Sequence, residues 1–274
     1  MTVQPIVARD RCRDVSMVGP AGLTRPPMVG VMPADVPTII ATSIGFDSRG
    51  RDRFDWDAGP IFDLAADLSG AERTPRVCYL GTATGDNATL IAGVYSALTT
   101  RFHPSHVELF SMPNVADVRE HFLAQDVIWV GGGSVANLLA LWRLHGWDEY
   151  LYDAWQAGVV LGGVSAGSIC WHLGGTTDSF GPELRPVTNG LGWLPYSNGV
   201  HYDSEPQRRP LFHRLIGDGT LPAGYATDDG VGLVYRGTEV VEAVADRPGC
   251  SAYFVKAGPD DRAVETVMEP RRLR

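Results

Sequence analysis

Ser165 lies in the pentapeptide GVSAG, residues 163–167, which fits the pattern G-x-S-x-G. The apolar run VVLGG precedes it and a segment of helical character follows, so the serine is expected on a tight turn between a strand and a helix. Glycines at such a turn tolerate a strained backbone and close packing of the neighbouring elements. This context indicates a nucleophilic serine, and the alternative is that small residues only let a strand pack tightly on a helix.

A nucleophilic serine needs a general base, and the chain contains seven histidines. His201 is the candidate, because it lies in the turn-rich segment SNGVHYDSE and its imidazole can take up the serine proton and return it to a leaving amine. His172 follows Ser165 by seven residues. On a helix this spacing places it about 10 Å away along the axis, which excludes it as the base. Surface or packing roles are expected for the remaining five, His103, His106, His121, His145 and His213.

An acidic residue should hold the imidazole in the correct tautomer by accepting a hydrogen bond from its second nitrogen. Asp178, in the segment GGTTDSFG, is the predicted partner of His201. Considered from the residues alone, Asp178 is equally well explained as an aspartate of a loop turn. Four other acids compete for the role, namely Asp203, Glu205, Asp228 and Asp229.

Two groups of backbone amides could stabilise the negative charge on a tetrahedral intermediate. The segment VIWVGGGS predicts a strand followed by a glycine loop, in which Gly132 and Gly133 allow backbone N–H groups to approach a ligand closely. Ala166 adds a further N–H at the start of the helix after Ser165. Nucleotide binding is the weaker interpretation of this loop, since G-x-G-x-x-G is not met, and no cofactor is expected.

The elements that position these residues alternate between strands and helices from residue 37 onwards. Strands are expected at 37–46, 76–86, 106–112, 127–134 and 159–165, and helices at 62–71, 87–102, 115–125, 135–146 and 148–158. Nearly all-apolar strands separated by helices are typical of a parallel sheet that is covered on both faces. The prediction is therefore a single α/β sandwich domain over residues 37–258.

The two ends of the chain differ from this pattern. Residues 1–36 are rich in proline and without clear periodicity, which predicts an extension that is disordered or becomes ordered on contact. Short, alternating, turn-rich segments at 190–203, 224–237, 238–248 and 251–258 predict antiparallel strands, and residues 259–274 are expected to be a tail. Exposed edge strands in this last third make a homodimer an expectation.

Composition and charge narrow the possible partners. The formal net charge is −9 and no basic run occurs, which argues against nucleic acid or an anionic membrane surface as the main partner. The four cysteines are far apart and form no C-x-x-C pair, so no metal site or disulfide framework is expected and a reducing cytoplasm fits best. No segment approaches the ~18 consecutive apolar residues of a membrane span, and no secretory signal is recognised.

Four segments, in this order, resemble the peptidase E and cyanophycinase family of serine peptidases (family S51). They are VGGGSVANLL, GVSAGSICW, GGTTDS and GVHYDSEPQRR, and the resemblance extends over residues 38–256. It implies a flavodoxin-related, class I glutamine-amidotransferase-like fold with a serine in place of the usual cysteine. It also implies a triad of Ser165 as nucleophile, His201 as base and Asp178 as the acid, with Gly132 and the Ala166 amide at the oxyanion.

The peptidase E branch of this family cleaves dipeptides with an N-terminal aspartate and uses an arginine downstream of the histidine to bind that carboxylate. Arg208 and Arg209 are the candidates here, although the intervening segment is shorter than in that branch. A planar guanidinium can bind a carboxylate through two hydrogen bonds, which an ammonium group cannot do. The alternative for each arginine is an exposed charge at the start of a helix.

The leading hypothesis is a serine peptidase that hydrolyses small peptides through an acyl-enzyme. One alternative is an α/β-hydrolase esterase, which shares G-x-S-x-G, but the interval of 36 residues from Ser165 to His201 is short for that fold. A second alternative is a non-catalytic module that binds a small acidic metabolite through the glycine loop and the arginines. The candidate triad disfavours this second alternative.

Overall fold

The computed structural model describes residues 34–48 and 56–274. Val31–Arg274 forms one compact unit, and the description below concerns this unit by itself. Residues 1–33, nearly all of the predicted proline-rich extension, lie outside the described part of the chain.

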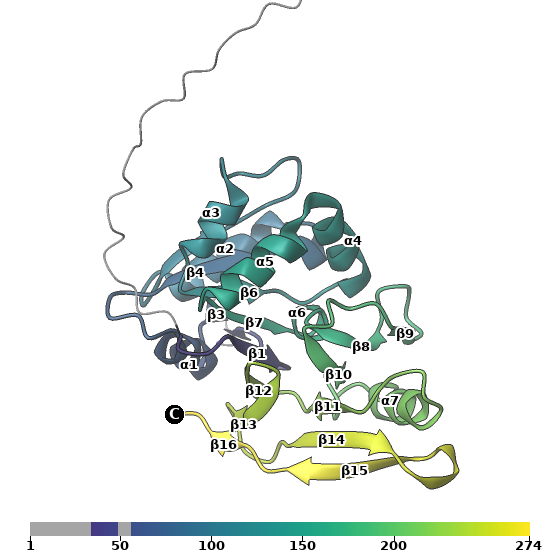
Figure 1. Cartoon of the computed structure of the whole chain (residues 1–274). Coiled ribbons are helices and arrows are strands. Elements are labelled where there is room, and N and C mark those ends of the chain that lie inside the picture. The colour runs from purple at the N-terminus through teal and green to yellow at the C-terminus, as the bar shows by residue number, and fades with distance from the viewer. Residues whose placement is uncertain (1–33, 49–55) are drawn as a thin grey trace, which may run out of the picture. The chain divides into compact units, whose positions relative to one another are not determined.

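An eight-stranded sheet forms the centre of the fold (Figure 1). Its strand order is β16-β13-β12-β1-β7-β6-β4-β5. The parallel part contains β1 (Thr38–Thr42), β7 (Val160–Val164), β6 (Val127–Val130), β4 (Arg76–Leu80) and β5 (His103–His106). Beside β1, the antiparallel strands β12 (Val231–Arg236) and β13 (Glu239–Ala245) extend the sheet, and the short β16 (Arg271–Arg272) closes it. Ser165 therefore follows a central strand.

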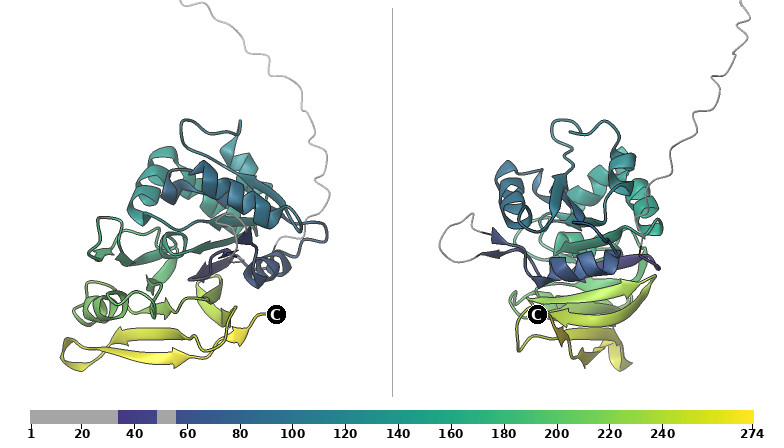
Figure 2. Two further views of the ribbon diagram at one scale, coloured as in Figure 1. Left: turned by 180° about the vertical axis from the view of Figure 1, so that it is seen from behind. Right: turned by 90° about the vertical axis from the view of Figure 1, so that its left-hand side faces the viewer.

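Helices cover both faces of this sheet, because side chains along each buried strand alternate between two hydrophobic cores (Figure 2). In β1, Ile40 packs in one core with α1 (Pro60–Ser69) and α2 (Ala88–Leu98), while Ile39 packs in the other. The second core is covered by α3 (Val118–Leu123), α4 (Val135–His145) and α5 (Trp147–Gln156). The predicted three-layer α/β sandwich is the observed architecture.

A second sheet of six strands holds most of the strands that follow Ser165. The short helix α6 (Ala166–Ile169) precedes its first strand in the chain. The order of strands across this sheet is β15-β14-β11-β10-β8-β9. The bounds are β8 (His172–Thr177), β9 (Arg185–Val187), β10 (Leu194–Gly199), β11 (Gly224–Thr227), β14 (Ala252–Ala257) and β15 (Ala263–Met268). Helix α7 (Arg208–Gly217) packs against β14 and β15. The small elements β2 (Asp47–Ser48), β3 (Trp56–Asp57), η1 (Thr82–Thr84) and η2 (Pro259–Asp261) complete the described fold.

Three details differ from the sequence-based predictions. The strand predicted at 106–112 lies earlier, at His103–His106. The strand β10 pairs in parallel with both β8 and β11, whereas antiparallel pairing was predicted for this region. Residues 259–274 are not a tail, because β15 pairs with β14 along its whole length and β16 pairs with β13. Local alternation identifies a strand but does not select its neighbour, which explains the second and third differences.

The strand β15 is one edge of the six-stranded sheet, and Val264 and Val267 on it are exposed. Exposed edge strands are templates for pairing with another chain. The expected homodimer stays a prediction.

Candidate active site

Ser165 has the strained backbone of a nucleophile at a strand-to-helix turn. Its φ is 58° and its ψ is −112°, a conformation that costs a non-glycine residue roughly 1–3 kcal/mol and persists only where the surroundings enforce it. Val164 ends β7, and Ala166 begins α6. A side chain at Gly163 would collide with the carbonyl of Gly167, so the elements meet too closely for larger residues. Both the strain and the close packing that G-x-S-x-G predicts are present.

The carboxyl end of β1 connects Ser165 to His201. The Ser165 N–H donates a hydrogen bond to the carbonyl of Thr42 over 3.1 Å, and the His201 N–H donates to Ser43 Oγ, also over 3.1 Å. Thr42 and Ser43, at the end of β1, thus hold the backbones of the candidate nucleophile and the candidate base. Ser165 follows a strand of the eight-stranded sheet, and His201 follows a strand of the six-stranded sheet. Ser43 Oγ is fixed in turn by Thr227 Oγ1 at 2.8 Å.

The imidazole of His201 is paired with Asp229. Its Nδ1 lies 2.5 Å from Asp229 Oδ1, and both side chains are partly exposed. A carboxylate at Nδ1 accepts the proton of that nitrogen and leaves Nε2 as the basic position. His201 also has a left-handed backbone, with φ at 52°, so its conformation is enforced by its surroundings.

Asp229 is held as a carboxylate by its neighbours. Burial raises its pKa, but hydrogen bonds from His201 and Ser204 and the positive charges of His201 and Arg247 outweigh this effect and lower it. The backbone of Asp229 is also fixed, because its N–H donates to Asp203 Oδ1 over 2.8 Å and its carbonyl accepts from Arg247 Nε over 2.9 Å. The site therefore presents an ionised acid to the imidazole.

Asp178, the acid predicted from the sequence, does not occupy this position. It is exposed, and within residues 34–48 and 56–274 its carboxylate has no hydrogen-bond partner. The turn that carries Asp178 is anchored elsewhere, because Ser179 Oγ accepts a hydrogen bond from the N–H of Ala136 over 3.3 Å at the start of α4. Asp229, which the sequence offered only as a competitor, takes the place beside His201.

Two of the three predicted oxyanion residues, Gly132 and Ala166, lie next to the serine, whereas a side chain at Gly133 would meet the carbonyl of Ala83. A Cβ atom built on Gly132 would lie 3.2 Å from Ser165 Cβ and 3.8 Å from Ser165 Oγ, so the glycine loop passes directly beside the nucleophile. Among the residues that the structure describes, the backbone N–H groups of Gly132, Gly133 and Ala166 have no acceptor. Unpaired N–H groups beside a nucleophile can bind a developing oxyanion.

We expect Gly132→Ala to lower kcat by about 10²-fold and to change KM little, since the new methyl group crowds the space where the oxyanion forms. The backbone of Gly132 is not in the left-handed region, so alanine fits its conformation. Gly81→Ala is the matched control, because its Cβ would meet only ordinary contacts of 3.4 Å or more. Steady-state kinetics of both variants test this, and equal activity would show that the glycine loop does not border the reacting atoms.

Neither Arg208 nor Arg209, predicted to bind the substrate, has a free guanidinium. Arg208 is buried and donates to the carbonyl of Thr176 and to Glu205 Oε2, the latter over 2.7 Å. Arg209 pairs with Glu265 and lies over the rings of Tyr202 and Tyr253, at 5.2 and 4.9 Å from their centres. Both arginines serve as internal connections in the described structure.

His172 is unsuited to be the base, as predicted, but for a different reason. The helix after Ser165 ends at Ile169, so His172 begins β8 and the helical spacing does not apply. The ring is fully buried, with Nδ1 2.9 Å from the carbonyl of Ser168 and Nε2 3.1 Å from Tyr235 Oη. Because a carbonyl only accepts, Nδ1 carries the proton and Nε2 accepts from the tyrosine. Burial lowers the pKa of His172 to about 4, although the hydrogen bond to Ser168 opposes this.

This buried histidine predicts acid sensitivity. The unfolded state, in which a histidine has a pKa of about 6.5, binds more protons than the folded state between pH 6.5 and 4. The contribution of His172 is therefore complete above pH 6.5 and is lost as the pH falls towards 4, by up to about 3 kcal/mol. We expect His172→Asn to flatten the pH dependence of the free energy of unfolding in this range, and His103→Asn, at an exposed site, controls for the change of residue type. Urea titrations at pH 7.5 and 5 measure the difference, and equal losses in wild type and His172→Asn would contradict it.

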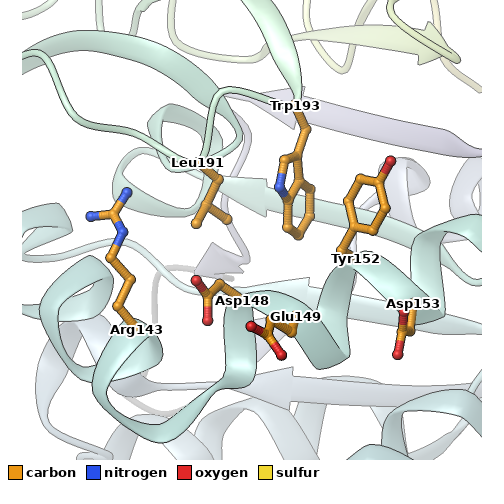
Figure 3. Close-up of a pocket in the computed structure, with 7 residues that line it drawn as sticks. All are labelled: Arg143, Asp148, Glu149, Tyr152, Asp153, Leu191 and Trp193. Atoms are coloured by element: carbon orange, nitrogen blue, oxygen red, sulfur yellow. The ribbon is translucent and has the colours of Figure 1, made fainter.

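A separate surface pocket of about 450 Å³ contains none of the candidate catalytic residues (Figure 3). It is lined by Arg143, Asp148, Glu149, Tyr152, Asp153, Leu191 and Trp193. Two of its charges are already engaged, because Arg143 donates to the carbonyls of Asn189 and Gly190 and Asp153 pairs with Arg119. We assign no part of the reaction to it.

The described residues contain no group of three or more histidine, cysteine, aspartate or glutamate side chains arranged to hold a metal ion. In the same part of the chain, no helix has the length and apolar character needed to cross a membrane.

Comparisons with known proteins identify the family of this chain. Residues 57–243 match the model of peptidase family S51. A protein of Bacillus subtilis (strain 168), named "Uncharacterized peptidase YgaJ", is 44% identical over 182 residues, which are 66% of this chain and 78% of the relative.

Two solved structures share the fold at low sequence identity. One is a peptidase from an acI-B1 Actinobacterium, with a TM-score of 0.59 and 17% identity over 86% of this chain and 95% of the other. The second is a putative peptidase E protein from Listeria monocytogenes EGD-e, with a TM-score of 0.55 and 16% identity over 77% and 98% of the two chains.

The fold and the site together define an α/β protein that carries a strained serine at a strand-to-helix turn, and both solved peptidase structures share this fold. The chain belongs to peptidase family S51 and is a serine-type peptidase. This confirms the resemblance that the four sequence segments indicated.

Proposed function

We propose that this peptidase hydrolyses small peptides, such as dipeptides, through a triad of Ser165, His201 and Asp229. The observation that carries the proposal is the His201 Nδ1–Asp229 Oδ1 pair at 2.5 Å, fixed to the same strand end as the strained Ser165. Asp229 replaces Asp178 as the acid in this proposal, because Asp229 is the one that contacts the imidazole.

The reaction proceeds in two halves. Ser165 Oγ attacks the peptide carbonyl while His201 Nε2 takes up the hydroxyl proton, and Asp229 stabilises the resulting imidazolium. The N–H groups of Gly132 and Ala166 stabilise the oxyanion. The imidazolium then protonates the leaving amine, which departs and leaves an acyl-enzyme. Water, deprotonated by His201, attacks the ester and releases the acid and the free serine.

The acidic-residue preference is the part of the prediction that the site supports least. It depended on Arg208 and Arg209, and both guanidinium groups already bind groups of the protein itself. We therefore propose that an acidic residue in the substrate brings little advantage over a neutral one.

A panel of dipeptides tests the substrate class. We expect measurable release of amino acids from at least one dipeptide, and rates for Asp-Leu, Asn-Leu and Ala-Leu within about tenfold of one another, because the guanidinium groups of Arg208 and Arg209 already bind groups of the protein. Turnover of none of them would contradict the dipeptidase proposal, and a preference of more than 100-fold for Asp-Leu would show that a cation does bind the substrate. Aryl esters assayed in parallel test the esterase alternative. Membership of a peptidase family disfavours both this alternative and the binding-module alternative.

For the compartment, we propose the cytoplasm. The three cysteines in the described residues, Cys78, Cys170 and Cys250, are buried free thiols, which is compatible with a reducing environment. Fractionation of native cells followed by immunoblotting tests this proposal.

A further inference from the structure

His201 and Asp229 each have a buried neighbour in sequence that is hydrogen-bonded to the C-terminal hairpin, which consists of β14 and β15. Tyr202 directly follows His201 and is 2% exposed, and Asp228 directly precedes Asp229 and is 5% exposed. The two segments are joined by a hydrogen bond of 3.2 Å from the Tyr202 N–H to the carbonyl of Thr227. Contacts that hold Tyr202 and Asp228 in place therefore also restrain the backbones of His201 and Asp229.

Tyr202 is fixed by Glu265 on β15. The tyrosine hydroxyl donates to Glu265 Oε2 over 2.9 Å, and His213 Nε2 lies at the same distance from that oxygen. Arg209 pairs with the second carboxylate oxygen. Burial raises the pKa of Glu265, but hydrogen bonds from His213, Tyr202 and Arg209 and the charge of Arg209 outweigh burial and lower it. Glu265 is therefore an ionised acceptor at the centre of three donors.

Asp228 is fixed by the neighbouring strand β14 and the residue before it. Its Oδ2 accepts from the Tyr253 hydroxyl over 3.1 Å and from the Ser251 N–H over 2.9 Å. The ring of Tyr253 lies 5.2 Å from that of Tyr202, and the guanidinium of Arg209 lies over both rings. The two supports thus form one connected network of Tyr202, Arg209, Asp228, Tyr253 and Glu265.

We propose that Tyr253 and Glu265, on the hairpin of β14 and β15, are positioning residues that hold His201 and Asp229 in their catalytic arrangement. Both lie beyond residues 57–243, the part of the chain that matches the family model. The proposal rests on the triad proposed above, and it gives the C-terminal hairpin a part in catalysis. It also gives Arg209 a role as a connection between the two tyrosines and Glu265.

The test compares Glu265→Gln and Tyr253→Phe with Glu242→Gln. Glu242 is a matched control, because it pairs with Arg271 in the same C-terminal region but contacts neither segment of the triad. We expect Glu265→Gln and Tyr253→Phe to lower kcat about 10- to 100-fold through misplacement of the base, with KM nearly unchanged. Because Glu265 acts through the Tyr202 hydroxyl, Glu265→Gln combined with Tyr202→Phe should lower kcat no further than the more severe single variant.

Three outcomes are informative. Urea unfolding midpoints that fall equally in Glu265→Gln and Glu242→Gln, together with a loss of kcat only in the former, support positioning. Wild-type kcat in both Glu265→Gln and Tyr253→Phe overturns the proposal. Tyr253→Phe removes a single oxygen atom, so the proposal can still be tested if Glu265→Gln fails to fold. A wild-type protein that neither cleaves peptides nor reacts with a fluorophosphonate overturns the proposed function and this inference with it.

Discussion

Replacing Ser165 with alanine is expected to lower kcat for peptide hydrolysis by at least about 10⁴-fold, because no other group can form the acyl-enzyme. The loss should appear in kcat rather than in KM, since the side chain contributes to the transition state more than to substrate binding. Stability should not fall, because alanine retains the Cβ and Ser165 Oγ makes no hydrogen bond within the described residues. Steady-state kinetics and a thermal unfolding curve measure both effects.

Ser168→Ala is the matched control for Ser165→Ala. Ser168 lies three residues further on, in the short helix α6, and its hydroxyl donates to Asn198 Oδ1 over 2.8 Å rather than to a residue of the proposed triad. It should lower stability by about 1 kcal/mol, the usual cost of one buried hydrogen bond, and leave kcat near the wild-type value. Residual peptidase activity of Ser165→Ala above one hundredth of wild type would mean that another nucleophile or a bound water performs the reaction.

Replacing Asp229 with asparagine is expected to lower kcat by about 10³- to 10⁴-fold, because an amide can donate to Nδ1 and stabilise the wrong imidazole tautomer. The low pKa of Asp229 sharpens this expectation, since the carboxylate is ionised wherever the imidazole is needed as a base. The geometry should survive, as asparagine has nearly the same shape. Kinetics on the most rapidly cleaved dipeptide measure the loss.

Asp178→Asn is the control that separates the two candidate acids. Because Asp178 is exposed and, among the described residues, Asp229 rather than Asp178 is hydrogen-bonded to the imidazole, replacement of Asp178 should leave kcat near the wild-type value. If Asp178→Asn is inactive while Asp229→Asn is active, the acid predicted from the sequence is the functional one, and the pairing of His201 with Asp229 has no catalytic role.

The residues that could be identified from the sequence are those whose signal is local. Ser165 is marked by the glycines around it and by the strand and helix that flank them, and Gly132 by a triple glycine directly after an apolar strand. Such patterns report on backbone conformation and packing within a few residues. The parallel sheet covered on both faces follows from the same kind of information, because each buried strand is a continuous apolar run.

The acid of the triad could not be chosen in this way, because the choice depends on strand order. β10 carries His201 after its end and lies between β8 and β11, so the acids after both neighbours, Asp178 and Asp229, are candidates. The turn after β11 is fixed to the same place as His201, since the Gly230 N–H donates to the carbonyl of Ser43 over 3.1 Å. The sequence contains one weak signal for Asp229. Two aspartates precede a glycine at 228–230, which indicates a turn directly after a strand.

The two arginines show a second limit of sequence-based reasoning. The resemblance to the peptidase E branch implied a carboxylate-binding role for an arginine after the histidine, but a partner for Arg209 lies 56 residues further along the chain, in the segment expected to be a tail. Long-range ion pairs of this kind leave no local pattern. The same holds for Ser43, which directly follows β1 and lies 158 residues before His201 in the chain. No sequence pattern indicated that it binds the His201 backbone.

The central claim is that Ser165 is the nucleophile and that the pair of His201 and Asp229 activates it. Peptide mapping by mass spectrometry after treatment with a fluorophosphonate tests this most directly, with wild type, Asp229→Asn and Asp178→Asn treated in parallel. The account predicts one adduct per chain, located on Ser165, that forms at the same rate in Asp178→Asn and far more slowly in Asp229→Asn. An adduct on another residue, or equally rapid labelling of Ser165 in Asp229→Asn, would contradict it.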